Sequence, residues 1–385
     1  MKYLASSPWL GRAFAPGLLA VMVLAAGCAD DKVHQLGAQS SPESAAGAED
    51  AAAPQFSVAD TATRQVGSSL SQTDSVRADS IARADSIAAL DSTAVKVKYN
   101  AGEDPEFARA MGWPVNGPEK LAGAVIPDKR IVAYYGNPLS KRMGVLGEYP
   151  KDEMLRRLDQ EVAEWEAADP SHPVQPALHL IAVVAQGEPG TAGKYRMIMT
   201  DSLVNMVYGW AKEHNSLLFI DIQTGQSTIQ EILPRFEWIL KNPDVHLAVD
   251  PEFMMVYNGA KPGAKIGSMK IADINYVTGE MAKLVKKYNI PPKVVVIHRF
   301  TRNMVLGDTK DVTLHPEVSL VMDMDGWGAP WLKRDSYRDY IVRHPMEFTG
   351  FKLFYGNDKK KEGSRLMTKE EVLKLRPTPM YIQYQ

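Results

Sequence analysis

Short apolar runs alternate with amphipathic segments from about residue 105 to residue 385, and this alternation limits the folds open to the chain. Eight runs rich in aliphatic and β-branched residues occupy positions 130–135, 177–184, 216–220, 245–249, 293–297, 318–322, 350–354 and 379–383. Near-continuous apolar runs are typical of parallel strands that are buried on both faces. The sequence therefore predicts eight parallel strands.

The segments between these runs have the spacing of amphipathic helices, at 152–166, 200–214, 227–241, 271–288, 333–344 and 369–374. Hydroxyl and acidic residues mark three helix starts: Thr200 with Asp201, Ser227 with Glu231, and Thr368 with Glu370 and Glu371. The link at 301–316 is poor in helical pattern, so that unit is irregular. Strand and helix alternating to eight strands predicts an α/β fold of the (β/α)8, TIM-like class.

An open, doubly wound sheet is the competing fold. Such a sheet usually begins with a glycine-rich turn after its first strand, where the backbone holds a dinucleotide. Here the first run is followed by Gly136-Asn137-Pro138, which is not that fingerprint. We therefore favour the barrel.

The first 27 residues have the order of a secretory signal peptide. Basic residues Lys2 and Arg12 come first, an apolar stretch at 14–24 follows, and small residues precede Cys28. The apolar stretch is shorter than the roughly 20 residues that a membrane-spanning helix needs. We expect residues 1–27 to be cleaved on export.

The run Leu24-Ala25-Ala26-Gly27-Cys28 resembles the lipobox of bacterial lipoproteins, although its leucine lies one place further from the cysteine than is usual. The resemblance implies that the thiol is acylated, with palmitate among the lipids, and that Cys28 begins the mature chain. This cysteine is the only one, so a disulfide framework is excluded. Ala29 is not the aspartate of an inner-membrane retention signal, which implies an outer membrane anchor.

Residues 28–103 are rich in Ala, Ser, Asp, Gln and Thr and bury too little apolar surface to offset the entropy of ordering. We expect a disordered tether there and a barrel domain at 104–385. The net charge of −2 carries no basic stripe, so nucleic acid is not an expected partner.

In a (β/α)8 barrel, function lies where the strands end at their carboxyl side. Acidic residues gather at these positions, and we select Asp221, Asp250, Glu252 and Asp323 as candidate catalytic groups. Crowded carboxylates shift one another's pKa, which is how acid and base roles are separated. Any one of them could also serve only a turn, as Asp before Pro or Gly often does.

Other polar and aromatic side chains at the same ends form a candidate substrate-binding set: Tyr135, Asn137, Gln223, His298, Asp325, Trp327 and Tyr355. Aromatic rings at a barrel mouth favour a flat, hydroxylated ligand such as a sugar. They could equally seal the top of the barrel. The histidines at 172, 179, 246 and 344 lie away from strand ends and are expected to be structural.

The chain from about residue 130 to 385 looks like the glycoside hydrolases built on (β/α)8 barrels. The stretch 249–253, with its Asp-Pro-Glu, is similar to fourth-strand acidic motifs in which the later carboxylate protonates the leaving oxygen, and that role would fall on Glu252. The seventh strand lacks the nucleophile of many retaining barrels, and the long aspartate series of the chitinase family is absent. The resemblance therefore implies Asp323 or Asp221 as the base for water in an inverting reaction.

Two other interpretations stay open. His298 with Asp221, Glu252 and Asp323 could hold a divalent metal for hydrolysis or isomerisation, although no compact histidine motif is present. A barrel without chemistry could simply hold a glycan. The main interpretation is a lipid-tethered enzyme that acts on a cell-wall or environmental polysaccharide and needs neither a cofactor nor a metal.

Overall fold

The computed structural model describes residues 98–361 and 364–385. The predicted signal peptide, the lipidation at Cys28 and the tether up to residue 97 lie outside this part of the chain. Within it, no helix is both long and apolar enough to cross a bilayer. At the predicted domain boundary, Glu103 is buried and its carboxylate lies 3.0 Å from the Nε of Arg334.

Eight parallel strands close into a barrel, as the sequence predicts. They are β1 (Arg130–Gly136), β2 (Val174–Ala185), β4 (Leu217–Ile222), β5 (Val245–Val249), β7 (Lys293–Arg299), β9 (Val318–Met324), β10 (Phe348–Leu353) and β11 (Tyr381–Tyr384). β1 pairs with both β2 and β11, so the sheet has no break around its circumference. The prediction of a (β/α)8 barrel is confirmed.

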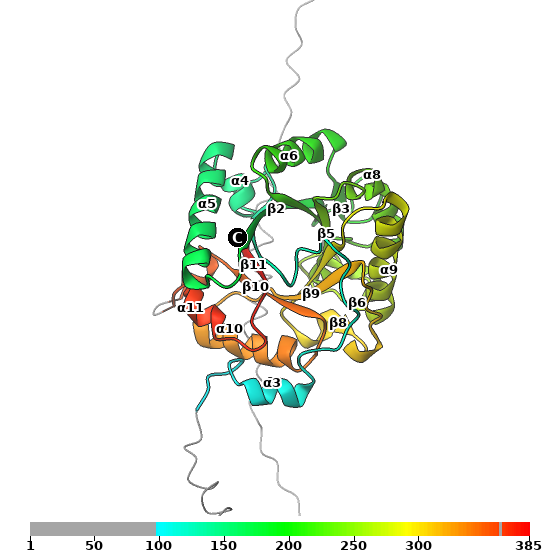
Figure 1. Cartoon of the computed structure of the whole chain (residues 1–385). Coiled ribbons are helices and arrows are strands. Elements are labelled where there is room, and N and C mark those ends of the chain that lie inside the picture. The colour runs from blue at the N-terminus through cyan, green and yellow to red at the C-terminus, as the bar shows by residue number, and fades with distance from the viewer. Residues whose placement is uncertain (1–97, 362–363) are drawn as a thin grey trace, which may run out of the picture.

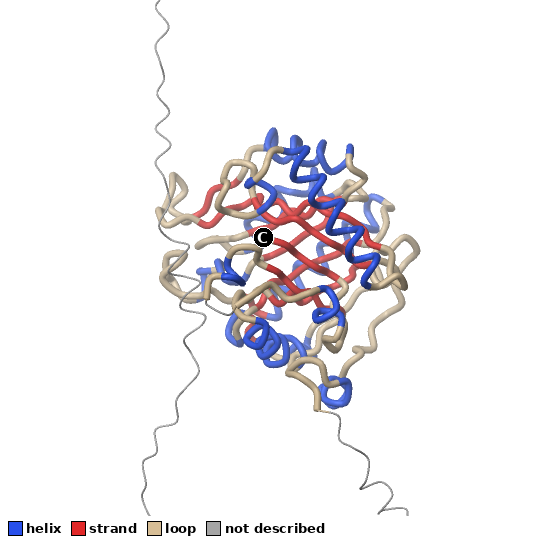
Figure 2. The backbone as a smooth tube through the Cα atoms, turned by 90° about the vertical axis from the view of Figure 1, so that its left-hand side faces the viewer, coloured by secondary structure: helices blue, strands red, loops and turns tan. Residues whose placement is uncertain are grey.

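Helices surround the ring of strands (Figures 1 and 2). They include α5 (Lys151–Ala168), α6 (Asp201–Glu213), α9 (Ile271–Tyr288), α10 (Pro330–Ser336) and α11 (Lys369–Leu373), and α3 (Pro105–Met111) and α4 (Val145–Glu148) come before them in the chain. The hydroxyl of Thr200 caps α6 and that of Thr368 caps α11, as predicted. Short 3₁₀ turns and a two-stranded pair, β6 (Met269–Lys270) with β8 (Val305–Leu306), complete the links.

The third helical segment differs from its prediction. It divides into α7 (Ile229–Ile232), η1 (Leu233–Phe236) and α8 (Glu237–Leu240), because Pro234 has no N–H to continue an α-helix. Its cap is Thr228, whose hydroxyl accepts the N–H of Glu231, and not Ser227. The hydroxyl of Ser227 instead accepts a hydrogen bond from the Nε of Arg196.

Two further differences concern strand and helix ends. β2 runs past the rim and pairs in antiparallel fashion with an additional strand, β3 (Arg196–Ile198). α10 continues as a π-helical segment, η6 (Tyr337–Val342), where the sequence predicts one helix over 333–344. The predicted irregular link at 301–316 contains only the 3₁₀ turns η4 (Arg302–Met304) and η5 (Thr309–Asp311) and the short β8.

The inside of the barrel is a packed core at its amino-terminal end. Phe219, Val296, Val321 and other inward side chains form one apolar cluster, and Ile126, from the segment before β1, belongs to it with no exposed surface. The hydroxyl of Ser319 donates to the carbonyl of Ile126 at 3.2 Å. This segment therefore covers the amino-terminal end of the barrel.

Candidate active site at the barrel mouth

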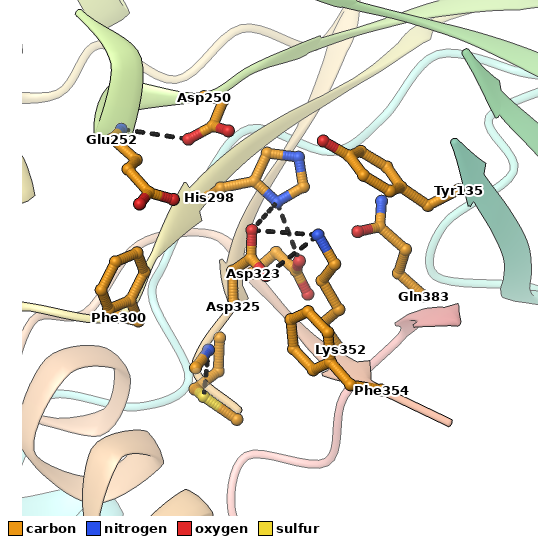
Figure 3. A network of polar contacts seen from close by, with 12 residues as sticks. Tyr135, Asp250, Glu252, His298, Phe300, Asp323, Asp325, Lys352, Phe354 and Gln383 are labelled. Carbon is orange, nitrogen blue, oxygen red and sulfur yellow. Dashed lines mark hydrogen bonds and ion pairs between the residues drawn. The ribbon is translucent and has the colours of Figure 1, made fainter. Parts of the chain in front are cut away.

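Strand register brings the polar side chains of the mouth together. His298 on β7 is the register partner of Asp323 on β9, and Lys352 on β10 is the partner of Gln383 on β11. Alternate residues of a strand share a face, so Asp325 lies on the same face as Asp323. Figure 3 shows these side chains converging from several strands on one space.

A histidine, two aspartates and a lysine form the centre of this network. The Nδ1 of His298 lies 3.1 Å from the Oδ2 of Asp323 and 3.3 Å from the Oδ2 of Asp325. The ammonium of Lys352 lies 3.0 Å from the Oδ1 of Asp325 and 3.8 Å from the ring centre of Tyr135. Lys352 is therefore a buried cation that an aspartate and an aromatic face hold in place.

Asp250 and Glu252 stand at the end of β5, the fourth strand of the barrel. Asp250 caps the 3₁₀ turn η2 (Pro251–Phe253), because its Oδ1 accepts the N–H of Glu252 at 3.0 Å. The other oxygen of Asp250 accepts a 3.3 Å hydrogen bond from Gln223. Both carboxylates are almost fully buried, with 3% and 4% of their surface exposed. The turn that places Glu252 is thus made by the neighbouring acid.

A second group lies within the same layer. His179 on β2, Asp221 on β4 and His298 are fully buried, and one candidate ligand atom of each lies within 4.8 Å of the others. The Oδ2 of Asp221 is 3.5 Å from the Nε2 of His179 and 3.9 Å from the Nε2 of His298. The metal-binding alternative from the sequence names Glu252 and Asp323 in place of His179.

Burial governs the pKa values of the mouth. It raises the pKa of Asp323 to about 7 and lowers the pKa of His298 to about 4. Burial also raises the pKa of Asp221 and of Asp325, although Lys352 and His298 oppose the rise. For Asp250, burial and then the charge of Glu252 raise the pKa well above its usual value. Protons are therefore retained among these carboxylates at a pH where exposed aspartates have lost theirs.

Replacing Asp250 by asparagine is expected to stabilise the fold at neutral pH. An aspartate whose pKa is raised on folding contributes nothing unfavourable below its unfolded pKa of about 3.9. Its contribution becomes unfavourable as the pH rises from there through the raised value. The gain in unfolding free energy of Asp250→Asn should therefore grow from about pH 4 upward, as measured by urea denaturation across pH. Asn at the exposed Asp128 serves as the control and should show no such pH dependence; a pH-independent gain in Asp250→Asn would contradict the expectation.

Most of the predicted site residues do meet at the mouth. Figure 3 shows Tyr135, Asp250, Glu252, His298, Asp323 and Asp325 around one space. Gln223 joins them through a hydrogen bond to Tyr135, and Asp221 lies 3.9 Å from His298.

Two predicted residues lie elsewhere. The amide of Asn137 donates to the carbonyl of Ile181 and accepts from the N–H of Leu139, which fixes a turn. The hydroxyl of Tyr355 donates to Glu161 on α5, outside the barrel wall.

Trp327 follows β9 and lines a neighbouring pocket of about 410 Å³. Trp331, of which 65% is exposed, forms part of the same wall, together with Arg334 and Arg365, which are both ion-paired with Glu371. Indole faces combined with guanidinium donors suit a ligand that has both apolar C–H faces and oxygen acceptors. Trp327 thus belongs to a pocket whose lining includes none of the other predicted site residues.

Sequence reasoning missed two central side chains. Lys352 interrupts an apolar run, and a charged residue in a strand buried on both faces is rare unless it is paired. A lysine at that position therefore indicates a buried ion pair. His179 was expected to be structural because it lies in the middle of its run. The structure instead places its ring 5.5 Å from the ring of His298, centre to centre.

No protein-family model matches the chain, and no curated protein is significantly similar to it. The barrel alone supports many chemistries, so its function has to be inferred from the side chains at the mouth.

Proposed function

We propose that this protein is a glycoside hydrolase that acts on a cell-wall or environmental polysaccharide through carboxylate acid and base catalysis. The observation that carries the proposal is the pair Asp250 and Glu252 at the end of the fourth barrel strand, joined by the hydrogen bond from the N–H of Glu252. The raised pKa of Asp250, caused by burial and then by Glu252, supports a proton held by this pair. An acid that keeps its proton at neutral pH is what protonation of a glycosidic oxygen requires.

In the proposed mechanism, Glu252 in its protonated form gives its own proton to the leaving oxygen and becomes a carboxylate, and Asp250 caps the turn that positions it. The second carboxylate, which activates water, is Asp323 or Asp221. The pKa of Asp323, raised by burial to about 7, would let it accept a proton near neutral pH. Its hydrogen bond to His298 fixes the orientation of its carboxylate.

Substrate binding is assigned to the rim. Tyr135, Gln223 and Asp325 keep a small exposed fraction of 4 to 8%, whereas Asp221, His298 and Asp323 have none. Trp327 and Trp331, beside the mouth, offer indole faces for sugar rings. We assign the first contacts of the sugar to these rim side chains.

The test is cleavage by the purified full-length protein on a panel of polysaccharides and peptidoglycan, with and without a chelator, followed by the appearance of reducing ends. Cleavage that depends on Glu252 supports the proposal. A folded protein that binds glycans without cleaving any member of the panel would instead be a glycan-binding barrel. Cleavage that a chelator abolishes and that survives Glu252→Gln would assign the chemistry to a metal-dependent hydrolase.

The proposal also places the protein outside the cytoplasm, held to the outer membrane by a lipid on Cys28, on its periplasmic or surface face. Support comes from the sequence order at 1–28, which resembles that of lipoproteins. Serine at position 28 keeps the size of the side chain but offers no thiol to acylate. In a diderm host we expect the wild-type protein in the outer membrane fraction and Cys28→Ser outside it, unprocessed. Equal fractionation of both would reject the anchor.

A further inference from the structure

Several polar atoms under the mouth face one another without a hydrogen bond. They are the Nε2 of His179 and of His298 and the carboxylate oxygens of Asp221, none of which makes a well-formed hydrogen bond within the described chain, although the Tyr135 hydroxyl and the Ile222 N–H lie close to Asp221. All three side chains have no exposed surface. Leaving such groups buried and unsatisfied is unfavourable, and more so for a charged group. We propose that His179, Asp221 and His298 bind one divalent first-row transition metal ion.

The proton on His298 can be placed from its contacts. Its Nδ1 faces two carboxylate oxygens, of Asp323 at 3.1 Å and of Asp325 at 3.3 Å. An ionised carboxylate only accepts hydrogen bonds, so Nδ1 carries the proton whenever Asp323 or Asp325 is ionised. The Nε2 of the neutral ring then presents a lone pair to Asp221. A carboxylate behind a histidine in this way orients the ring in many metal sites.

The neighbours of His179 also allow its proton to lie on Nδ1. Its Nδ1 lies 2.6 Å from the hydroxyl oxygen of Tyr381 and 3.0 Å from the amide of Gln383. The amide oxygen of Gln383 has no partner among the described residues, and a half-turn of the amide, which leaves its shape unchanged, sets that oxygen against Nδ1. A proton on Nδ1 is then satisfied, and Nε2 offers its lone pair to the same space as His298.

Two imidazole lone pairs and one carboxylate therefore converge in a site without exposure. Ligand atoms bound 2.0–2.2 Å from zinc lie within about 4.3 Å of one another. The distances of 3.5 Å and 3.9 Å from Asp221 to the two rings are within that reach. Two histidines with one carboxylate form a common donor set for Zn²⁺ and related ions, which keep further positions open.

The charge of the layer also favours a divalent ion. Asp221 lies among other buried acids of the mouth, including Asp323 and Asp325. A divalent cation bound there would favour the ionised form of these carboxylates.

The proposed metal site lies below the rim side chains that a substrate would contact first. Tyr135 covers it, with its ring centre 5.2 Å from that of His179 and 6.2 Å from that of His298. The ligands come from β2, β4 and β7, so the ion ties together three strands of the barrel. The inference does not rest on the proposed glycosidase activity.

The experiment uses the purified full-length protein, first stripped with a chelator and then titrated with Zn²⁺, with Mn²⁺ and Co²⁺ in parallel. Elemental analysis should give one metal ion per chain, and saturating Zn²⁺ should raise the melting temperature by about 5 °C or more. Asp221→Asn and His298→Gln should lose both effects. His246→Gln is the matched control, because His246 is a buried barrel histidine whose Nδ1 accepts the N–H of Val294 instead of facing an acid.

Two outcomes would overturn the inference. In the first, the wild-type protein is folded by circular dichroism, takes up less than a tenth of an equivalent of each ion and shows no change in melting temperature. A proton would then bridge the three side chains in place of a metal ion. The other is equal Zn²⁺ uptake by the wild type and both ligand variants. Neither readout needs a substrate, so a protein that binds Zn²⁺ but cleaves no glycan would keep the metal site and reject the glycosidase.

Discussion

Glu252→Gln is expected to lower kcat on a cleaved polysaccharide by about 10²- to 10⁴-fold, the usual contribution of a general acid. The amide has the size of the carboxylic acid and cannot deliver the proton. The backbone of Glu252 also stays in place, because its N–H is held by Asp250 and its carbonyl accepts the N–H of Gly267 at 2.6 Å. The measurement is initial rates of reducing-end release over a range of substrate concentrations.

A control separates this loss from a general effect of charge at the rim. Glu188 lies in the loop that follows β2 on the same side of the barrel, and its side chain is exposed. Glu188→Gln should leave kcat within about twofold of the wild type. Binding of the polysaccharide to Glu252→Gln, measured by affinity electrophoresis, should match the wild type. A variant at Glu252 with unchanged kcat would remove Glu252 from the mechanism.

Lys333→Met is expected to lower the free energy of unfolding by about 3–5 kcal/mol, as the loss of one partner of a buried ion pair does. The ammonium of Lys333 and the carboxylate of Asp358 are both fully buried and lie 3.1 Å apart. Lys333 also donates to the carbonyls of Gly326 and Lys352, each at 2.8 Å. Without it, Asp358 keeps a buried charge with only backbone N–H donors.

Urea denaturation measures this effect as a lower midpoint at an unchanged slope. Lys283→Met is the matched control, because Lys283 pairs with Glu280 on the surface of α9 with 76% of its side chain exposed, and its midpoint should not move. Adding Asp358→Asn to Lys333→Met should restore part of the loss. Equal midpoints for Lys333→Met and the wild type would show that the pair contributes no net stability.

The barrel could be predicted because its strands are buried on both faces, which leaves a nearly continuous apolar run for each of them. The position of His179 could not. β2 extends six residues beyond His179 to pair with β3, so the end of its apolar run does not mark the mouth. From halfway along that long strand, the side chain of His179 reaches Asp221 and His298, which lie near the ends of shorter strands.

The alternation of side chains along β10 explains why Tyr355 does not face the mouth. Lys352 points inward, and Leu353 belongs to the outer core between barrel and helices, with Tyr355 packed against that same core. Tyr355 is thus two residues from an outward position and faces α5, where it meets Glu161. Side-chain distances across the barrel depend on the pairing of strands that are far apart in the chain, and the sequence pattern does not contain them.

Closure of the barrel by β1 and β11 has a consequence for the order in which the chain folds. A polypeptide is made from its amino terminus, so β1 emerges early and its pairing with β2 satisfies only one of its edges. The backbone groups on the other edge of β1 have no partner until the whole intervening sequence has been made and β11 arrives. The side chains of β1, which are mostly apolar and buried in the folded barrel, stay uncovered for the same time. Unpaired apolar edges recruit other chains. The interval between the first strand and the last is therefore when this protein is most exposed to aggregation.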